Sequence, residues 1–376
     1  MDFQLDNEQT ALRDAVRSLL KDRYSVEQRQ EIVASEPGWD AKLWTQLAEM
    51  GLLGLPFAED DGGMGAGPIE VMLVAQELGR SLAPAPFLGA VVIAGQLVAR
   101  AGTSEQRREI LGKLSEGTLL PALAHNEPAS RWSTRAYGVV AEQDDDRWTI
   151  TGVKEPVPHG ASADLLIVTA LVGDDTRLFV VDADQSGVER TGYANHDGSR
   201  SARVAFSGAA ATPLGDGGQG SAALDEVIVR AQAALCAEAL GCMEQAVDIT
   251  VDYLKTRKQF GVPLAKFQAL THRASDMYVS LELARSMAVY ASMALTSDAA
   301  DPTIAARTKL QIGRSGRHIE QEAIQLHGGI GMTAEYSVGH YASRLVAIEH
   351  TFGDIQHQLS VLAGEVGDHG VVDVLA

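Results

Sequence analysis

Two short stretches decide how this chain folds: RKQFGVPLAKFQ at residues 257–268 and QLHGGIG at residues 325–331. The first ends a long helical pattern, because Gly261 and Pro263 stop a helix before a second helical run begins. An arginine, an amide and a glycine turn at a helix junction suit an anionic ligand, because Arg257 offers a planar fork of donors and the turn exposes backbone N–H groups. Together the stretches indicate a pyrophosphate site. Either one alone is better explained by a helix hairpin with solvated basic side chains.

The two stretches resemble the flavin-contacting segments RxxFG and QxxGG of the acyl-CoA dehydrogenase family. In that family both segments reach across a subunit interface to the FAD of a neighbouring subunit. The resemblance therefore implies FAD as the cofactor, bound at the subunit interface. It places the cofactor contacts of this chain at Arg257, Gln259, Phe260, Gln268, Gln325, His327, Gly328 and Gly329.

Composition and charge narrow the function further. A chain of 376 residues with 45% apolar content can bury two or three domains. Its net charge of −19 argues against nucleic acid or an anionic membrane as a partner, because both need a positive surface. The chain shows no apolar signal core and no apolar run long enough to span a bilayer, so we expect a cytoplasmic protein. We expect no metal site, and we expect Cys236 and Cys242 to be unbridged core residues.

The spacing of apolar residues changes twice along the chain, and the three resulting regions predict an α+β fold. Residues 1–118 carry apolar positions at helical spacing and predict an N-terminal helical domain. In residues 119–214 the apolar positions recur about every second residue, which predicts a small antiparallel β domain, a barrel or a sandwich. Residues 221–376 are helical again and predict a C-terminal four-helix bundle. This order, and the loop LLGLPFAEDDGGMGAG at residues 52–67, resemble the acyl-CoA dehydrogenase fold along the whole chain.

Periodicity, caps and turn residues set the individual elements that we expect. The expected helices cover residues 6–24, 40–50, 69–82, 87–101, 104–116, 221–256, 267–297, 301–327 and 353–366. The expected strands cover residues 148–154, 164–172, 176–183, 187–193 and 201–209.

The catalytic base that the family uses is missing from its usual place. Oxidising an acyl thioester between Cα and Cβ takes a carboxylate to remove the Cα proton, and the family usually supplies the Glu of a YEGTSEIQ segment beyond QxxGG. Aligned without gaps, that Glu position falls on Phe352; aligned on the GDIQ letters it falls on His350. Some members carry the base on the long helix before RxxFG, and the matching position here is Ala231. We therefore assign no catalytic base to this chain, with Asp354 and Glu349 as weak candidates.

The flavin-facing motifs of the β domain also depart from the family pattern. Where the family has TEPxxGSD, this chain has NEPASRW at residues 126–132. Where the family has KxWITNG, this chain has KEPVPHG at residues 154–160, and Pro158 offers neither a side-chain donor nor an N–H. The half of the site that a subunit builds for its own FAD is thus degraded, while the half lent to a neighbour is intact.

This asymmetry favours a subunit of a heteromeric acyl-CoA dehydrogenase, most similar to the small subunit of pimeloyl-CoA dehydrogenase-like enzymes. The implied partners are a second acyl-CoA dehydrogenase subunit, an acyl-CoA from fatty-acid or steroid side-chain breakdown, and an electron-transfer acceptor. One alternative is a self-sufficient homomeric enzyme in which Asp354 or Glu349 is a displaced base. The structural interpretation is that Asp354 opens the last helix and that Glu349 is a surface carboxylate. A third hypothesis is a catalytically silent member of the family that only binds.

Overall fold

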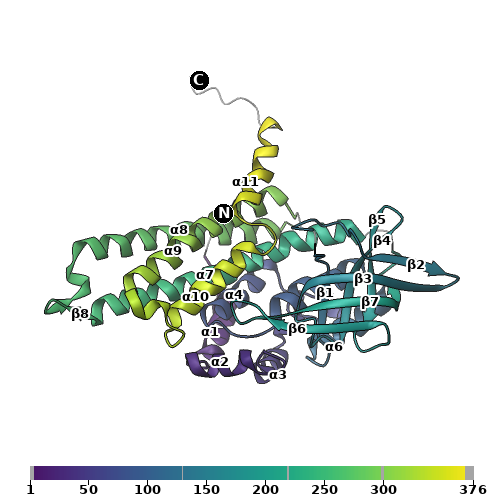
Figure 1. The fold of residues 1–376 in the computed structure, drawn as a ribbon, viewed down its shortest axis with the longest axis horizontal. Coiled ribbons are helices and arrows are strands. Elements are labelled where there is room, and N and C mark those ends of the chain that lie inside the picture. The colour runs from purple at the N-terminus through teal and green to yellow at the C-terminus, as the bar shows by residue number, and fades with distance from the viewer. Residues whose placement is uncertain (1–3, 129, 218–219, 298–299, 369–376) are drawn as a thin grey trace.

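A computed structural model describes residues 4–128, 130–217, 220–297 and 300–368. Figure 1 shows a long helical bundle at one side, a twisted sheet at the other, and a group of shorter helices beneath both. The sheet and the shorter helices cover one end of the bundle and leave its other end free. These three parts are expected from the sequence, and the site lies where they meet.

In the residues described, six α-helices and a π-helical segment form most of the amino-terminal part, and polar caps start several of them. They are α1 (Asn7–Leu20), α2 (Val26–Ala34), α3 (Ala41–Glu49), α4 (Pro68–Arg80), a π-helical segment (Leu88–Gly95), α5 (Gln96–Ala101) and α6 (Ser104–Ser115). We did not predict α2, because none of its residues is buried and its apolar pattern is weak. Its signal was the capping box in which Ser25 and Gln28 satisfy each other's backbone N–H groups.

The middle of the chain forms one seven-stranded sheet. Its strands are β1 (Pro121–Ala124), β2 (Val140–Asp144), β3 (Arg147–Pro158), β4 (Leu165–Val172), β5 (Asp175–Asp182), β6 (Val188–Ala194) and β7 (Arg200–Pro213). Pairings run from β4 through β2, β3, β7 and β5 back to β4, so the strands close into a barrel. The prediction of an antiparallel domain was wrong in part, because the short strand β1 pairs with β4 in parallel. Neither β1 nor β2 was expected.

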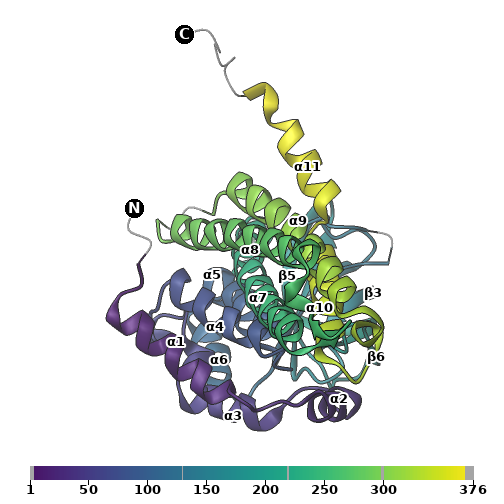
Figure 2. The same cartoon turned by 90° about the vertical axis from the view of Figure 1, so that its left-hand side faces the viewer.

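The carboxy-terminal part is a bundle of long helices. It contains α7 (Gly220–Thr256), α8 (Gln268–Leu295), α9 (Pro302–His327), α10 (Ser337–His350) and α11 (Ile355–Gly364). A two-residue hairpin, β8 (Lys258–Gln259) and β9 (Val262–Pro263), joins α7 to α8 at the free end of the bundle (Figure 1). The sequence did not predict α10, because the glycine-rich stretch before it reads as a turn. In Figure 2, α11 projects away from the body of the molecule.

Close packing of α4 on α7 fixes the amino-terminal helices against the bundle. A Cβ on Gly241 would lie 1.9 Å from the carbonyl oxygen of Gln76, so only glycine allows this approach. Both cysteines are buried and unbridged, as expected. In the part of the chain that the structure describes, no helix is long and apolar enough to cross a membrane, and no cluster of side chains could hold a metal ion.

Candidate functional site

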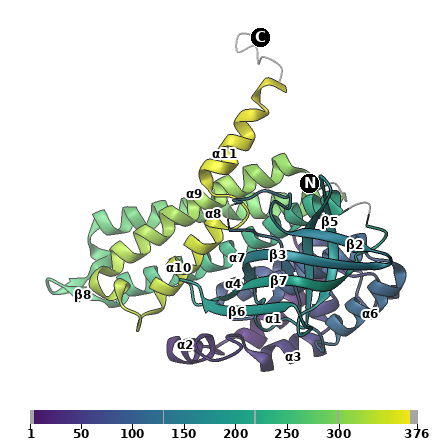
Figure 3. The ribbon, with the colours of Figure 1, turned by 45° about the vertical axis from the view of Figure 1, so that its right-hand side comes forward.

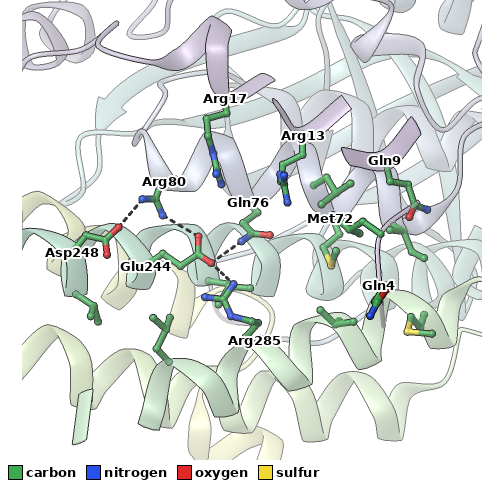
Figure 4. Close-up of a pocket in the computed structure, with 18 of the residues that line it drawn as sticks. Gln4, Gln9, Arg13, Arg17, Met72, Gln76, Arg80, Glu244, Asp248 and Arg285 are labelled. Atoms are coloured by element: carbon green, nitrogen blue, oxygen red, sulfur yellow. Dashed lines mark hydrogen bonds and ion pairs between the residues drawn. The ribbon is translucent and has the colours of Figure 1, made fainter. Parts of the chain in front are cut away.

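One cavity lies where the three parts of the molecule meet, and a second lies between the amino-terminal helices and the bundle. The larger, of about 940 Å³, is enclosed by the sheet, the π-helical segment and α4 on one side and by α7, α10 and α11 on the other. The smaller, of about 460 Å³, lies between α1, α4, α7 and α8 (Figure 4). The larger is within the range typical of ligand sites, and it is bordered by the motifs at residues 126–132 and 154–160 and by the turn at residues 350–352.

The charged side chains that line the smaller cavity form a network of salt bridges. Figure 4 shows Gln76, Arg80 and Arg285 converging on Glu244, which is buried. Arg80 lies 3.2 Å from Glu244 and 2.6 Å from Asp248. The remaining arginines of its wall are also paired, Arg17 with Glu77 at 2.6 Å and Arg13 with Asp14 at 2.8 Å. Each of these guanidinium groups has a carboxylate partner, so the network's role is to join α1, α4, α7 and α8.

A buried ion pair supports the sheet side of the larger cavity. The Lys154 ammonium lies 2.7 Å from Glu127 and also donates to the hydroxyl of Thr169 and the carbonyl of His125. Burial lowers the pKa of Lys154 to about 8, and Glu127 opposes that shift. Burial raises the pKa of Glu127, but Lys154 and two backbone N–H groups bring it below its usual range. Glu127 borders the cavity but is committed to this pair, which makes it a poor base.

The eroded flavin motifs meet on the wall of the larger cavity. Pro156 and Pro158 line it from the end of β3. Trp132 lines it from the loop between β1 and β2, where its indole donates to the carbonyl of His350 at 3.2 Å. The Trp132 ring also packs on His357 of α11, with the ring centroids 4.9 Å apart. At the two positions where the family motif KxWITNG has Trp and Thr, this wall therefore has proline rings, while Ser130, Ser133 and Thr134 add hydroxyl groups to it.

The turn between α10 and α11 occupies the place where the family's base is expected. His350, Thr351 and Phe352 line the cavity at this turn, and none carries a carboxylate. The ring of His350 faces its own helix, with Nδ1 2.9 Å from the carbonyl oxygen of Val346. The alternative base position, Ala231, is fully buried in the core.

The two weak candidates for a displaced base are held in structural contacts. Asp354 caps α11 by accepting from the backbone N–H of His357 at 2.8 Å, in agreement with its expected place at a helix start. Glu349 accepts from the N–H of Ile355 and from Arg317, both at 3.1 Å. The interpretation of Glu349 as a surface group was wrong, because its side chain is buried beneath α11. Among the residues described, neither carboxylate belongs to the cavity wall.

A buried lysine fixes the same turn from below. The Lys309 ammonium donates to the carbonyls of Ile348, Glu349 and Gly353 at 2.8, 2.9 and 3.2 Å. The carbonyls of Ile348 and Glu349 belong to the last turn of α10, and that of Gly353 follows in the turn, so the lysine caps the helix end and ties the turn to it. Burial lowers the pKa of Lys309. The backbone that lines the cavity here is therefore held by three hydrogen bonds from one side chain.

The residues predicted to contact FAD lie elsewhere, at the free end of the bundle. Figures 1 and 3 show the β8–β9 hairpin at the end opposite the sheet. Arg257 and Gln259 are exposed there, and Phe260 is 91% exposed, although its ring packs edge-on against Phe267. Gln268 is the first residue of α8 and is also exposed.

The QxxGG segment ends α9 at the same end of the bundle. His327 is buried, stacks on Tyr253 with centroids 4.4 Å apart, and shares a hydrogen bond through Nδ1 with the carbonyl of Ala323 at 2.7 Å. Its Nε2 is buried and has no hydrogen-bond partner among the described residues, which leaves an acceptor for a ligand hydroxyl. Gly328 has φ +64, and nothing lies within 4 Å of a Cβ built on Gly328 or Gly329. Gln325 is exposed beside this open backbone, so the segment fits part of an FAD molecule.

A charged cluster at the inner end of the large cavity was missed by sequence reasoning. Arg344 of α10 donates to Asp197 and to Glu238 of α7, both at 2.7 Å. Arg29 of α2 donates to the carbonyls of Leu82 and Asp197 at 3.0 and 3.1 Å. These residues belong to four separate segments, and no local pattern links them.

Known proteins similar to this chain share its architecture. The chain matches the sequence profiles described as "Acyl-CoA dehydrogenase, N-terminal domain" over residues 6–118 and "Acyl-CoA dehydrogenase, C-terminal domain" over residues 218–367. It is 30% identical over 363 residues to acyl-CoA dehydrogenase IpdE2 of Mycolicibacterium smegmatis, covering 96% of this chain and all of that one. It is 28% identical over 352 residues to the probable acyl-CoA dehydrogenase YngJ of Bacillus subtilis, covering 90% and 92% of the two chains.

Solved structures agree with these relatives. A variant of the steroid ACAD Tcur3481-Tcur3483 superposes with a TM-score of 0.88 at 31% identity, covering 96% of this chain and 98% of that one. The ChsE4-ChsE5 complex from Mycobacterium tuberculosis shares the fold with a TM-score of 0.90 at 24% identity, covering 99% and 100% of the two chains. The sequence match to IpdE2, the two profiles and the fold together show that this chain belongs to the acyl-CoA dehydrogenase family, FAD-dependent oxidoreductases that act on CH–CH bonds.

Proposed function

We propose that this chain is one subunit of a heteromeric FAD-dependent acyl-CoA dehydrogenase, that it lends contacts to an FAD held mainly by a different chain, and that it supplies no catalytic base. One observation carries the proposal. The residues that fit FAD lie at the free end of the bundle, while the chain's own cavity has prolines and a base-free turn where flavin and base are expected. A surface directed away from its own cavity is useful for FAD only if another chain approaches it.

In this proposal the chain's residues bind and orient the cofactor. Arg257 and Gln259 would donate to the pyrophosphate, and His327 and the open backbone at Gly328 and Gly329 would contact the adjoining part of FAD. When bound, FAD accepts the hydride that leaves Cβ as the acyl thioester is desaturated. Proton removal from Cα would fall to a carboxylate of the partner subunit, and an electron-transfer acceptor would reoxidise the flavin.

Two features support a partner of the same family. The relative at 31% identity, the steroid ACAD Tcur3481-Tcur3483, bears a name that joins two proteins. The exposed apolar groups around the hairpin, Phe260, Val262 and Met332, also favour a covering chain. We extend the proposal to a dicarboxylyl- or otherwise bulky acyl-CoA as substrate, in keeping with the resemblance to pimeloyl-CoA dehydrogenase-like small subunits.

The self-sufficient and silent alternatives make different predictions about structure and charge. A displaced base would need Asp354 or Glu349 to leave the contacts that begin α11. A silent member that binds nucleic acid would need a positive surface, which a chain with a net charge of −19 can supply only locally.

Flavin stoichiometry tests the proposal. The chain is purified alone and together with the acyl-CoA dehydrogenase chain that copurifies with it, and flavin absorbance is compared with protein mass. We expect little FAD in the chain alone and one FAD per heterodimer in the complex. One FAD per chain in a homomer of this protein would contradict the proposal.

A further inference from the structure

One segment of the chain covers the inner end of the large cavity without being packed into the core. It comprises residues 25–38, contains α2, and we call it the flap. Figures 2 and 3 show α2 at the outer edge of the molecule, below β6 and α10. Its residues Arg29, Val33 and Gly38 line the cavity. No residue of 25–37 is buried, so the flap gives the cavity a wall but adds no buried side chain to the hydrophobic core.

The two ends of the flap are fixed to each other. The hydroxyl of Tyr24 donates to Asp40 at 2.8 Å, and the guanidinium of Arg23 lies 3.0 Å from the same carboxylate. Asp40 also caps α3, and its backbone N–H donates to the carbonyl of Pro84 at 2.8 Å. Surface loops whose ends meet in this way are frequently functional. Arg23, Tyr24 and Asp40 thus form a fixed neck from which the flap extends.

Polar side chains hold the flap in its closed position, and their acceptors are backbone carbonyls. Arg200 of β7 donates to three carbonyls at the end of α2, each at 3.1 Å. From the flap, Arg29 and Gln30 donate to carbonyls of neighbouring segments at 2.8 to 3.1 Å. The acceptors are the carbonyls of Val33, Ala34, Ser35, Leu82, Asp197 and Ala334.

Opening the flap would leave no buried carboxylate without its cation. Asp197 keeps its ion pair with Arg344, at 2.7 Å, when Arg29 moves away. The ion pair between Glu36 of the flap and Arg200, at 3.6 Å, involves an exposed carboxylate and contributes little. Water can replace the hydrogen bonds to carbonyls once both partners are exposed. The flap is therefore held by contacts that local opening can exchange for water.

Apolar residues line the cavity next to the flap. Leu82 and Pro84 belong to this wall, and their carbonyls accept hydrogen bonds from Arg29 and from the neck. Leu78 and Phe87 extend the wall along the cavity. With the flap closed, Arg29 and the residues beside it end the cavity here. With the flap open, a large apolar group would extend past this point along the wall.

We infer that the flap opens to lengthen the inner end of this cavity, so that the cavity holds an acyl group too large for its closed form, and that Arg200 sets how readily the flap opens. The inference rests on the proposed function for its ligand class, an acyl-CoA. Its failure is seen in the amide exchange of the flap and in affinity ratios, whereas the proposed function fails on flavin stoichiometry.

Hydrogen–deuterium exchange of the purified chain tests the opening. We expect flap amides to exchange at least about tenfold faster than those of α4, because local opening exposes the flap without unfolding the core. Arg200→Met should speed flap exchange by a further factor of about ten and leave α4 unchanged, because losing hydrogen bonds from a charged donor makes opening easier. Arg190→Met is the matched control, because this arginine of β6 also donates to three carbonyls, all outside the flap. Flap amides as protected as those of α4, or equal acceleration by the two variants, would overturn the inference.

Binding of butanoyl-CoA and naphthylbutanoyl-CoA to the complex connects the opening to the ligand. The affinity for the larger thioester relative to butanoyl-CoA should rise about tenfold in Arg200→Met, because less binding free energy is used to open the flap. Gln30→Ala removes one hydrogen bond to the flap and should shift the ratio in the same direction by less. Arg190→Met should keep the wild-type ratio. An unchanged ratio in both flap variants, an equal change in Arg190→Met, or no binding of the larger thioester would refute the inference.

Discussion

Arg344 should be among the side chains on which the stability of the fold depends most. It bonds Asp197, whose side chain is 1% exposed, and Glu238, whose side chain is 16% exposed. Replacing it by methionine keeps the bulk but leaves two carboxylates without their cation. Breaking a buried pair in this way costs about 3 to 5 kcal/mol, because the remaining charge stays out of water. At roughly 2 °C per kcal/mol for a long chain, Arg344→Met should lower Tm by about 6 to 10 °C.

Thermal unfolding followed by circular dichroism measures the effect, with Arg13→Met as the control. The Arg13 pair is solvent-accessible and worth at most about 1 kcal/mol, so the control should unfold close to wild type. A double-mutant cycle with Asp197→Asn separates the ion pair from lost packing, and the double variant should cost less than the sum of the single ones. Additive costs, or an Arg344→Met protein within 2 °C of wild type by the same scale of roughly 2 °C per kcal/mol, would refute the reasoning.

The same pair predicts a pH dependence of definite sign. Burial raises the pKa of Asp197, but Arg344 and Ser199 outweigh burial and hold it below the ordinary value of 3.8. A carboxyl whose pKa is lower in the folded state stabilises the fold above its unfolded pKa, and that contribution is lost as the pH falls through the folded pKa. The Tm difference between wild type and Arg344→Met should therefore be full above pH 3.8 and narrow below it.

Two further predictions concern the cofactor and the base. In the complex, Arg257→Ala should weaken FAD retention by about ten- to a hundredfold without unfolding the chain, because a charge-assisted hydrogen bond contributes about that much to affinity. Lys255→Ala, which changes an exposed lysine nearby, is the control. Equal FAD occupancy in the Arg257 variant and wild type would show that the arginine is only a surface group. Glu349→Gln and Asp354→Asn should leave turnover of the complex within a fewfold, because losing a true general base costs about 10²–10⁴ in rate. A collapse of turnover in Asp354→Asn with FAD still bound would instead identify a displaced base in this chain.

Local sequence signals were enough to identify the family and to predict most of the helices and strands. The helices α7, α8 and α9 and the strands β3 to β7 follow from apolar periodicity and from turn residues, which act over a few positions. The residues His350 and Phe352 were enough to expect no carboxylate at the family's usual base position. The roles assigned to Arg257, Gln325 and the residues around them rest on the resemblance and stay predictions.

Only the tertiary structure decided the rest, because the contacts involved join distant parts of the chain. Strand β1 is four residues long and is defined by its parallel partner β4, more than forty positions away in each pair. Arg344 and Asp197 are 147 positions apart, and Lys309 caps a helix end about 40 positions beyond it. Nothing in the sequence around Asp197 marks it, since ion pairs depend on which segments the fold brings together. The sequence alone thus determined the family and the exposed segments at the end of the bundle, whereas packing of the sheet, α2 and α10 around α7 decided the chemistry of the cavity.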